Sequence, residues 1–321
     1  MKYKPAFIGL EDIDKDDTGL KVTTRFSIDD ILPSIIDHGI INPPVLIKKN
    51  QGTYKVVCGF RRIAACTHLN IKEVAARILQ PDTDTLEIVK IAISDNTMQR
   101  SMNLVEESRA LILLSKCIND EIQLTRTSVG LGLPDNLSLI KKTISISYLP
   151  KIIQNAVAEG WISLAMAMEL GGIEKETAVY TARLFRSLKI GLNKQREILT
   201  NLLEIAKRDE ITIMDILDDA YFQGIVNDPD TDTVKKSSAV RNYIKERRFP
   251  EITKAEKIFR SRLKTLKLNN KMMKLLPPKS FEGEYFESNF RFKDLTDFKS
   301  QGEAVNRLIE NPVMKDILLK Q

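Results

Sequence analysis

Residues 54–66 read Tyr-Lys-Val-Val-Cys-Gly-Phe-Arg-Arg-Ile-Ala-Ala-Cys, and this stretch decides the fold. Val56 and Cys58 alternate with their neighbours, a period of two that predicts a half-buried strand. Gly59 then allows a tight turn in which a side chain would clash. A helix follows the glycine, so the stretch predicts a strand, a turn and a helix in succession.

Two arginines, Arg61 and Arg62, fall in the first turn of that helix. The N-terminus of a helix already carries partial positive charge, so it is an unfavourable place for cations. Two arginines there indicate that an anion belongs at the site, and a phosphate is the anion we expect. The alternative is that both are solvated surface charges, and these residues alone do not separate the two interpretations.

Length and composition are those of a globular protein with two or three domains, because 321 residues can enclose more than one core. The first residues contain no apolar run of signal-peptide length, and no stretch approaches the ~20 apolar residues of a membrane span. Cys58, Cys66 and Cys117 form no CxxC pair, so we expect buried thiols in a reducing cytoplasm, with no membrane partner.

Charge is distributed unevenly along the chain. Residues 235–293 contain 17 Lys and Arg against 6 Asp and Glu, whereas the whole chain has a net charge of only +6. Such asymmetry indicates a segment that binds a polyanion. The alternative is a solvated basic face on ordinary helices.

Secondary-structure signals change character near residue 83. Before it, the sequence predicts a helix that ends at Gly39 and strands over 45–48, 54–58 and 73–79. After it, the pattern is helical, and Asn103 with Glu106 has the spacing of a capping box at a helix start. We expect an Asp-rich linker over 223–237. Basic helices over 240–248 and 254–276, a hairpin within 281–292 and a last helix over 303–310 complete the prediction.

Three segments and a helix-turn-helix pattern occur in order. The segments are Ser34-Ile-Ile-Asp-His-Gly-Ile-Ile-Asn-Pro-Pro-Val45, Gly59-Phe-Arg-Arg62 and Asp95-Asn-Thr-Met-Gln-Arg-Ser-Met-Asn-Leu-Val-Glu-Glu107. In this order and spacing they resemble the ParB family of chromosome and plasmid partition proteins, over about residues 22–172. The resemblance implies a nucleotide-binding domain with the sulfiredoxin fold, in which CTP closes a dimer as a clamp around DNA.

The resemblance also implies which residues hold the nucleotide. Gly59, Phe60, Arg61 and Arg62 match the first phosphate box, Asp95 and Asn96 match the second, and Arg25 matches the arginine on the cytosine side. CTP with Mg²⁺ is the implied cofactor, and Asp95 is the implied metal ligand.

The chain departs from the family pattern at three points. Phe60 stands where Glu or His is frequent, and Asp95 is shorter than the usual Glu. The position of the family's second-box arginine is Gln99, and Arg100 comes one residue later. One residue is a turn of ~100° on a helix, so Arg100 need not reach the same phosphate. Arg100 stays a candidate ligand, no catalytic residue is assigned, and CTP hydrolysis is left open.

The helix-turn-helix is predicted over residues 125–145, with a turn at 132–135. If the second helix enters the major groove, Asn136 and Ser138 meet base edges while Lys141 and Lys142 meet phosphates. The alternative for 125–170 is a plain helical bundle. In the C-terminal third, basic helices that grip DNA and an aromatic hairpin that forms a dimer interface are both compatible with the sequence.

We therefore predict an α+β protein: a small mixed α/β ParB/sulfiredoxin-like domain, a mainly helical helix-turn-helix domain and a basic C-terminal α(+β) region. The expected parts are a flexible arm 1–20, a nucleotide-binding domain 21–102, a DNA-binding domain 103–222, a linker 223–237 and a basic domain 238–321. The predicted function is CTP-dependent DNA binding in partition or at the nucleoid, as a cytoplasmic homodimer with double-stranded DNA and a partition ATPase as partners. The alternatives are a helix-turn-helix transcription regulator without nucleotide turnover, and a nuclease or phosphotransferase on the same fold.

Overall fold

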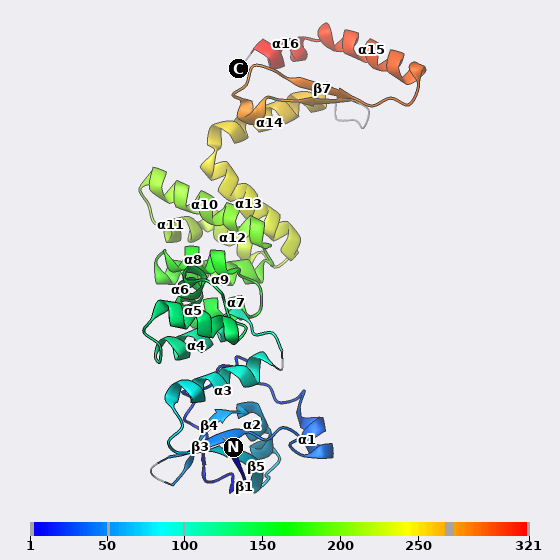
Figure 1. Cartoon of the computed structure of the whole chain (residues 1–321). Helices are drawn as coiled ribbons and strands as arrows, with labels where there is room; N and C mark the ends of the chain where they lie inside the picture. The colour runs from blue at the N-terminus through cyan, green and yellow to red at the C-terminus, as the bar shows by residue number, and fades with distance from the viewer. Residues whose placement is uncertain (1–2, 50–51, 99, 267–272, 320–321) are drawn as a thin grey trace. The chain divides into compact units, whose positions relative to one another are not determined.

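The computed structural model describes residues 3–49, 52–98, 100–266 and 273–319 (Figure 1). The chain divides into two compact units, Met1–Gln195 and Arg196–Gln321, and each is treated by itself. The first unit contains the segments that resemble ParB. The second contains the whole basic stretch 235–293.

A five-stranded mixed sheet forms the base of the first unit. Its strands are β1 (Tyr3–Gly9), β2 (Ile13–Asp14), β3 (Val45–Lys48), β4 (Tyr54–Cys58) and β5 (Glu73–Leu79), in the order β1-β5-β3-β4-β2. β1 is antiparallel to β5 and β3 is antiparallel to β4, whereas β3 with β5 and β2 with β4 are parallel. The three strands predicted from the sequence are confirmed.

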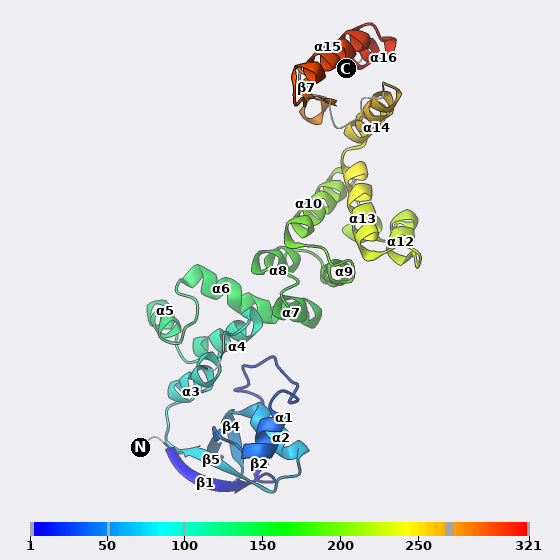
Figure 2. The ribbon, with the colours of Figure 1, turned by 90° about the vertical axis from the view of Figure 1, so that its right-hand side faces the viewer.

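Helices cover both faces of this sheet (Figure 2). Helices α1 (Leu32–His38) and α2 (Phe60–His68) lie on one face, where Leu46 and Val56 are buried. Helix α3 (Thr85–Thr97) lies on the other face. The residues next in sequence, Val45 and Val57, are buried there, because successive side chains of a strand point to opposite faces.

The prediction of a flexible arm over 1–20 is wrong. β1 pairs with β5 along seven positions, from Tyr3 opposite Leu79 to Gly9 opposite Glu73. It is an edge strand, which tolerates Pro5 and leaves Phe7 exposed while Ile8 is buried. The acidic residues that follow hid this strand from the sequence analysis.

The rest of the first unit is helical. Its helices are α4 (Leu104–Ser115), α5 (Glu121–Gly130), α6 (Leu137–Ser145), the short η1 (Ile146–Tyr148), α7 (Lys151–Ala158), α8 (Leu164–Gly171) and α9 (Lys175–Ser187). Helix α10 (Leu192–Asp209) contains the boundary between the units. The predicted capping box is confirmed, since Asn103 and Glu106 bond reciprocally at the start of α4.

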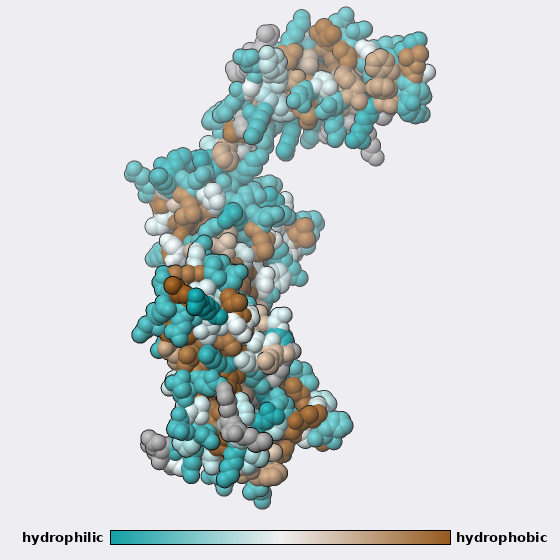
Figure 3. All heavy atoms as spheres, viewed as in Figure 1, coloured by the Kyte–Doolittle hydropathy of each residue, from teal (hydrophilic) through white to brown (hydrophobic). Residues whose placement is uncertain are grey.

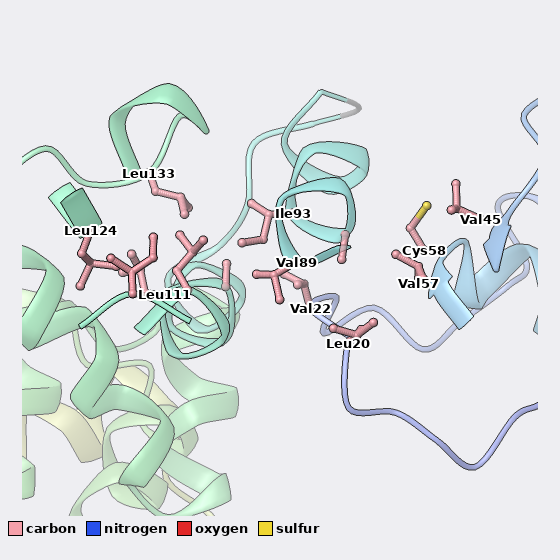
Figure 4. Packing of buried hydrophobic residues seen from close by; sticks show 14 of the residues in the cluster. Leu20, Val22, Val45, Val57, Cys58, Val89, Ile93, Leu111, Leu124 and Leu133 are labelled. Atoms are coloured by element: carbon pink, nitrogen blue, oxygen red, sulfur yellow. The ribbon is translucent and has the colours of Figure 1, made fainter. Parts of the chain in front are cut away.

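One apolar core joins the sheet to these helices (Figure 4). In Figure 4, Val89 and Ile93 of α3 lie between the sheet and the helical part. The buried sheet residues are Val45, Val57 and Cys58, and the buried helical residues include Leu111, Leu124 and Ile140. The apolar core therefore continues across the domain boundary expected at 102/103, because α3 packs against both the sheet and the helical part.

The second unit corrects three predictions. Residues 223–237 are no linker, because α12 (Ala220–Asn227) and α13 (Thr233–Arg248) occupy most of them and Asp232 caps α13. The helix expected over 254–276 ends early as α14 (Pro250–Thr265), and Met273–Leu276 is strand β6. β6 pairs with β7 (Glu287–Phe290), so the hairpin is not contained within 281–292.

The remaining elements of the second unit are α11 (Ile213–Leu217), η2 (Lys279–Phe281), α15 (Leu295–Ile309) and α16 (Pro312–Leu319). The capping box of Thr212 and Asp215 starts α11. The last helix begins earlier than the expected 303, and α16 was not foreseen. Hydrophobic side chains reach the surface of this region (Figure 3), among them Leu295, Phe298 and Ile309 of α15.

Gly59 enables the turn between β4 and α2. Its φ is +93°, in the left-handed region, and a Cβ at this position would lie 2.7 Å from Cβ of Pro44. We expect Gly59→Ala to lower the free energy of unfolding by about 2 to 4 kcal/mol, from backbone strain and a steric clash together. Urea unfolding of the whole chain measures this.

Gly160→Ala is the matched control. Gly160 has φ +78° but open space where the Cβ would be, so only the backbone strain of about 1 kcal/mol remains. Equal losses in the two variants would show that contact with Pro44 does not constrain the turn.

Candidate functional site

A pocket of about 150 Å³ opens beside the N-terminus of α2. Seven of the eight predicted nucleotide-binding residues line it, namely Gly59, Phe60, Arg61, Arg62, Asp95, Asn96 and Arg100. Three further lining residues, Val22, Thr23 and Ile31, were not predicted from the sequence. Segments more than thirty positions apart in the sequence thus meet in one pocket.

The two arginines of α2 are held by side chains and carbonyl oxygens from other segments. Arg61 donates from Nε to the Ser27 carbonyl oxygen at 2.9 Å and forms an ion pair with the exposed carboxylate of Asp30. Arg62 donates to the carbonyl oxygen of Asn42, and its Nη2 lies 2.7 Å from Oδ2 of Asp95. Both guanidinium groups are therefore oriented at the helix N-terminus, where a phosphate would meet them together with free backbone N–H groups.

Asp95 and Asn96 lie in the last turn of α3. Asn96 donates from its amide to the Ala92 carbonyl oxygen at 2.8 Å, which fixes its orientation. Beside them, burial and then the charge of Asp95 raise the pKa of Cys58 to about 12. Cys58 is therefore a neutral, buried thiol and not a nucleophile.

Arg100 differs from its expected role as a phosphate ligand. Its Nη1 and Nη2 lie 2.6 and 2.7 Å from the two carboxylate oxygens of Glu106, and Nη2 also donates to Oγ1 of Thr23 at 3.2 Å. This bidentate pair engages both terminal nitrogens of Arg100, which lies just beyond the end of α3 and still lines the pocket. Gln99, the position of the family's arginine, lies outside the described residues.

Glu106 is the centre of a buried network that the sequence analysis did not find. Its side chain is fully buried and accepts hydrogen bonds from four residues. Besides Arg100, the donors are Thr23 Oγ1 at 3.2 Å, Thr24 N at 2.8 Å, Thr24 Oγ1 at 3.1 Å and Asn103 N at 3.1 Å. Although burial opposes ionisation, these donors lower its pKa to about 2. The capping-box spacing was visible in the sequence, but its partners at Thr23 and Thr24 carry no local signal.

Arg25 is the one predicted nucleotide residue that does not line the pocket. It lines a neighbouring cleft of about 530 Å³ together with Phe26, Arg100 and Arg109. Arg100 borders both hollows, so the cleft adjoins the pocket.

A metal ion would find one carboxylate in the pocket, that of Asp95. Among the described residues there is no group of three or more His, Cys, Asp or Glu side chains that could hold a metal by themselves. Mg²⁺ is commonly bound through one or two carboxylates plus substrate phosphates, so Asp95 fits a metal that arrives with a nucleotide.

The predicted DNA-binding residues lie on the exposed side of α6. Asn136 is its N-cap: Oδ1 accepts from the Leu139 N–H at 2.8 Å, and Nδ2 donates to Asp135 at 3.2 Å. Lys141 pairs with Glu121 of α5 at 2.8 Å, with both side chains well exposed. Ser138 and Lys142 are exposed, and the surface ion pair of Lys141 is weak, so these three side chains can contact a ligand readily. The amide of Asn136 is less available, because it already forms the N-cap hydrogen bonds.

A mixed sheet with an arginine-bearing helix N-terminus, followed by paired helices, defines a domain suited to phosphate ligands. Residues 8–97 match the family model described as the ParB N-terminal domain. The resemblance to the ParB family seen in the sequence is therefore confirmed over this part of the chain. None of the helices in the described part of the chain has the length and apolar character needed to span a membrane.

Curated relatives extend the similarity into the helices. A chromosome-partitioning protein ParB of Myxococcus xanthus is 26% identical over 142 residues, covering 44% of this chain and 46% of the relative. A nucleoid occlusion protein of Oceanobacillus iheyensis is 31% identical over 172 residues, covering 53% of this chain and 58% of the relative. The chain thus spans about half the length of the curated relatives it matches.

Solved structures of ParB proteins are also similar. The Caulobacter crescentus ParB complexed with CTP-γ-S is 20% identical, covering 57% of this chain and 98% of that one, with a TM-score of 0.27. A Pnob8-like ParB-N domain is 14% identical, covering 75% of this chain and 97% of that one, with a TM-score of 0.36.

The buried carboxylate predicts a pH-dependent stability. Because the pKa of Glu106 falls from 4.5 to about 2 on folding, its contribution is complete above pH 4.5 and disappears as the pH falls through 2. We expect Glu106→Gln to lower the free energy of unfolding by about 3 kcal/mol at pH 7, with the difference shrinking from pH 5 to pH 2. Denaturant unfolding of both proteins across this range measures it.

Glu107→Gln is the control, the same substitution one residue later. Burial raises the pKa of Glu107, so replacing its charge is expected to leave stability at pH 7 unchanged or slightly higher. A loss at Glu106 that stays constant down to pH 2 would contradict the assignment of an ionised, buried carboxylate.

Proposed function

We propose that the chain is a ParB-like, nucleotide-dependent DNA-binding protein that acts in DNA partition or at the nucleoid. The observation that carries this proposal is the convergence of Arg61, Arg62, Asp95 and Asn96 on one pocket in a ParB N-terminal domain. The curated relatives, named chromosome-partitioning and nucleoid occlusion proteins, support the same direction.

The nucleotide is proposed to bind through its phosphates at the N-terminus of α2. Asp30 is exposed and pairs with Arg61, so a phosphate can replace it at little cost. Asp95 is half-buried and would keep Arg62 in place or accept Mg²⁺ beside the phosphates. CTP is the proposed nucleotide because of the resemblance to ParB, and a solved ParB neighbour was crystallised with CTP-γ-S.

Coupling between nucleotide and DNA is proposed to run through Glu106. A phosphate in the pocket would compete with Glu106 for Arg100, which lines the pocket wall. Glu106 lies in the first turn of α4, and Ser108 Oγ of this helix donates to the Ile144 carbonyl oxygen near the end of α6 at 3.1 Å. A change in the Arg100–Glu106 pair would therefore reach the helix that we propose for DNA recognition.

DNA is proposed to bind along α6, with Ser138 near base edges and Lys142 at a phosphate. A neighbouring ParB structure is a complex with the centromeric parS site. A homodimer and a partition ATPase as partner are further parts of the proposal, and they rest on the ParB resemblance.

A second candidate function is a DNA-binding regulator that senses nucleotide without hydrolysing it. The observation that favours it is the state of Arg100, which Glu106 already holds in a bidentate pair. A nuclease or phosphotransferase is less well supported, because Asp95 is the single carboxylate among the residues that line the pocket.

Calorimetric titration with CTP, ATP, GTP and UTP in Mg²⁺ tests the nucleotide proposal. We expect CTP to bind most tightly to the wild-type chain, and Arg61→Ala to weaken binding about 10- to 100-fold through the loss of a charge-assisted contact. Arg183→Ala is the control, since Arg183 is an exposed arginine on α9 away from the pocket.

Two results would count against the proposal. Equal affinity of the Arg61→Ala and Arg183→Ala variants would place the nucleotide elsewhere. No binding of any nucleotide by the wild type, with DNA present or absent, would remove the nucleotide dependence and leave a DNA-binding protein.

A further inference from the structure

A further hollow in the first unit is lined by cations that do not line the nucleotide pocket. It is a groove of about 250 Å³ between the segment 19–21, helix α4 and the start of α7. Four basic side chains line it, those of Lys21, Arg109, Lys116 and Lys151. Arg109 lies on α4 and Lys116 is the C-cap residue of the same helix, seven positions or about two turns further along.

No Asp or Glu is among the residues that line the groove, and none of the four cations forms an ion pair with another described residue. Arg109 donates to the Thr23 carbonyl oxygen at 2.8 Å, and Lys151 donates to Oε1 of Gln154 at 3.2 Å. Lys21 has its Nζ 4.9 Å from the centre of the Phe26 ring, and Lys116 is exposed. These contacts are all with neutral groups, and only Arg109 feels a nearby carboxylate, that of Glu106, so most of the positive charge of the groove is uncompensated.

The lowered pKa values of two of the four cations show the electrostatic cost of this arrangement. Burial, and then the charge of Arg109, lower the pKa of Lys21. Burial likewise lowers the pKa of Arg109, although the charge of Glu106 acts in the opposite direction. An anion in the groove would stabilise both charged forms, because opposite charge nearby offsets lost hydration.

The walls of the groove are fixed by neutral hydrogen bonds. Gln154 is buried and donates from Nε2 to the carbonyl oxygens of Ser147 and Leu149 at 2.9 and 2.8 Å. Lys151 is the first residue of α7, whose N-terminus adds partial positive charge. The cations therefore surround a preformed site.

We infer that this groove binds a phosphate of the DNA backbone, beside the contacts made by α6. The inference rests on the proposed DNA binding and adds a site outside the helix-turn-helix. The groove includes Ser147, which follows α6 directly within η1 and whose Oγ lies 2.7 Å from that of Ser108. Exposed Lys116 and Lys151 suit a duplex, since a helix in the major groove brings phosphates to the elements next to it.

The test measures how binding to a DNA duplex depends on salt. The variant Lys116→Gln/Lys151→Gln removes two exposed cations and spares Arg109, which supports the backbone. Its matched control, Lys72→Gln/Lys175→Gln, removes the same charge at exposed positions outside the groove. We expect the slope of log K against log [KCl] to become shallower by about 2 in the groove variant and to stay unchanged in the control.

Two further arms separate the sources of phosphate. Lys116→Arg/Lys151→Arg keeps the charge and should retain the wild-type slope, while CTP affinity should be unaffected in every variant. Equal slopes for groove variant and control would overturn the assignment. A loss of CTP affinity with an unchanged slope for DNA would also overturn the assignment, because it would show that the groove binds the nucleotide. Failure of the wild type to bind DNA would instead overturn the proposed function, and the groove assignment with it.

Discussion

The buried carboxylate of Glu106 connects the parts of the first unit. An ionised side chain without solvent contact is strongly destabilising unless donors surround it. Here Arg100, Thr23, Thr24 and Asn103 supply them. They come from three parts of the fold: the wall of the pocket, the extended segment before α1 and the start of α4. None of these segments can shift without exposing or orphaning the charge.

The need to keep the Glu106 carboxylate hydrogen-bonded explains how the phosphate site and the helices that follow it can be coupled. Arg61 and Arg62 are oriented by partners that a ligand could replace or retain, so the pocket is preorganised for an anion. The core that runs from β4 through α3 into α4 and α6 gives the same connection in apolar form. In the proposed coupling, the Arg100–Glu106 ion pair rearranges while the apolar core keeps its packing.

Local signals sufficed to predict the central strands, the Gly59 turn and the anion site at Arg61 and Arg62, and the resemblance to ParB implied most of the other pocket residues. The burial of residues 73–79 alternates, whereas 45–48 and 54–58 are short, largely apolar runs with consecutive buried residues. The partner of Arg100 was not predictable, because Glu106 looked complete as a capping-box residue and its contacts to Thr23 and Thr24 are long-range. Strand β1 was not predicted because an edge strand tolerates polar residues and Pro5. The helices within 223–237 were not predicted because Asp residues are common both in linkers and at helix N-caps.

The central claim is that occupancy of the pocket reaches α6 through Glu106. Amide hydrogen exchange of the whole chain, with and without CTP and Mg²⁺, tests it directly. The account predicts changed exchange in residues 59–62, in the amides of Thr24 and Asn103 that donate to Glu106, and onward through α4 into α6. Changes confined to residues 59–62 and 95–96, with α4 and α6 unaltered, would contradict it.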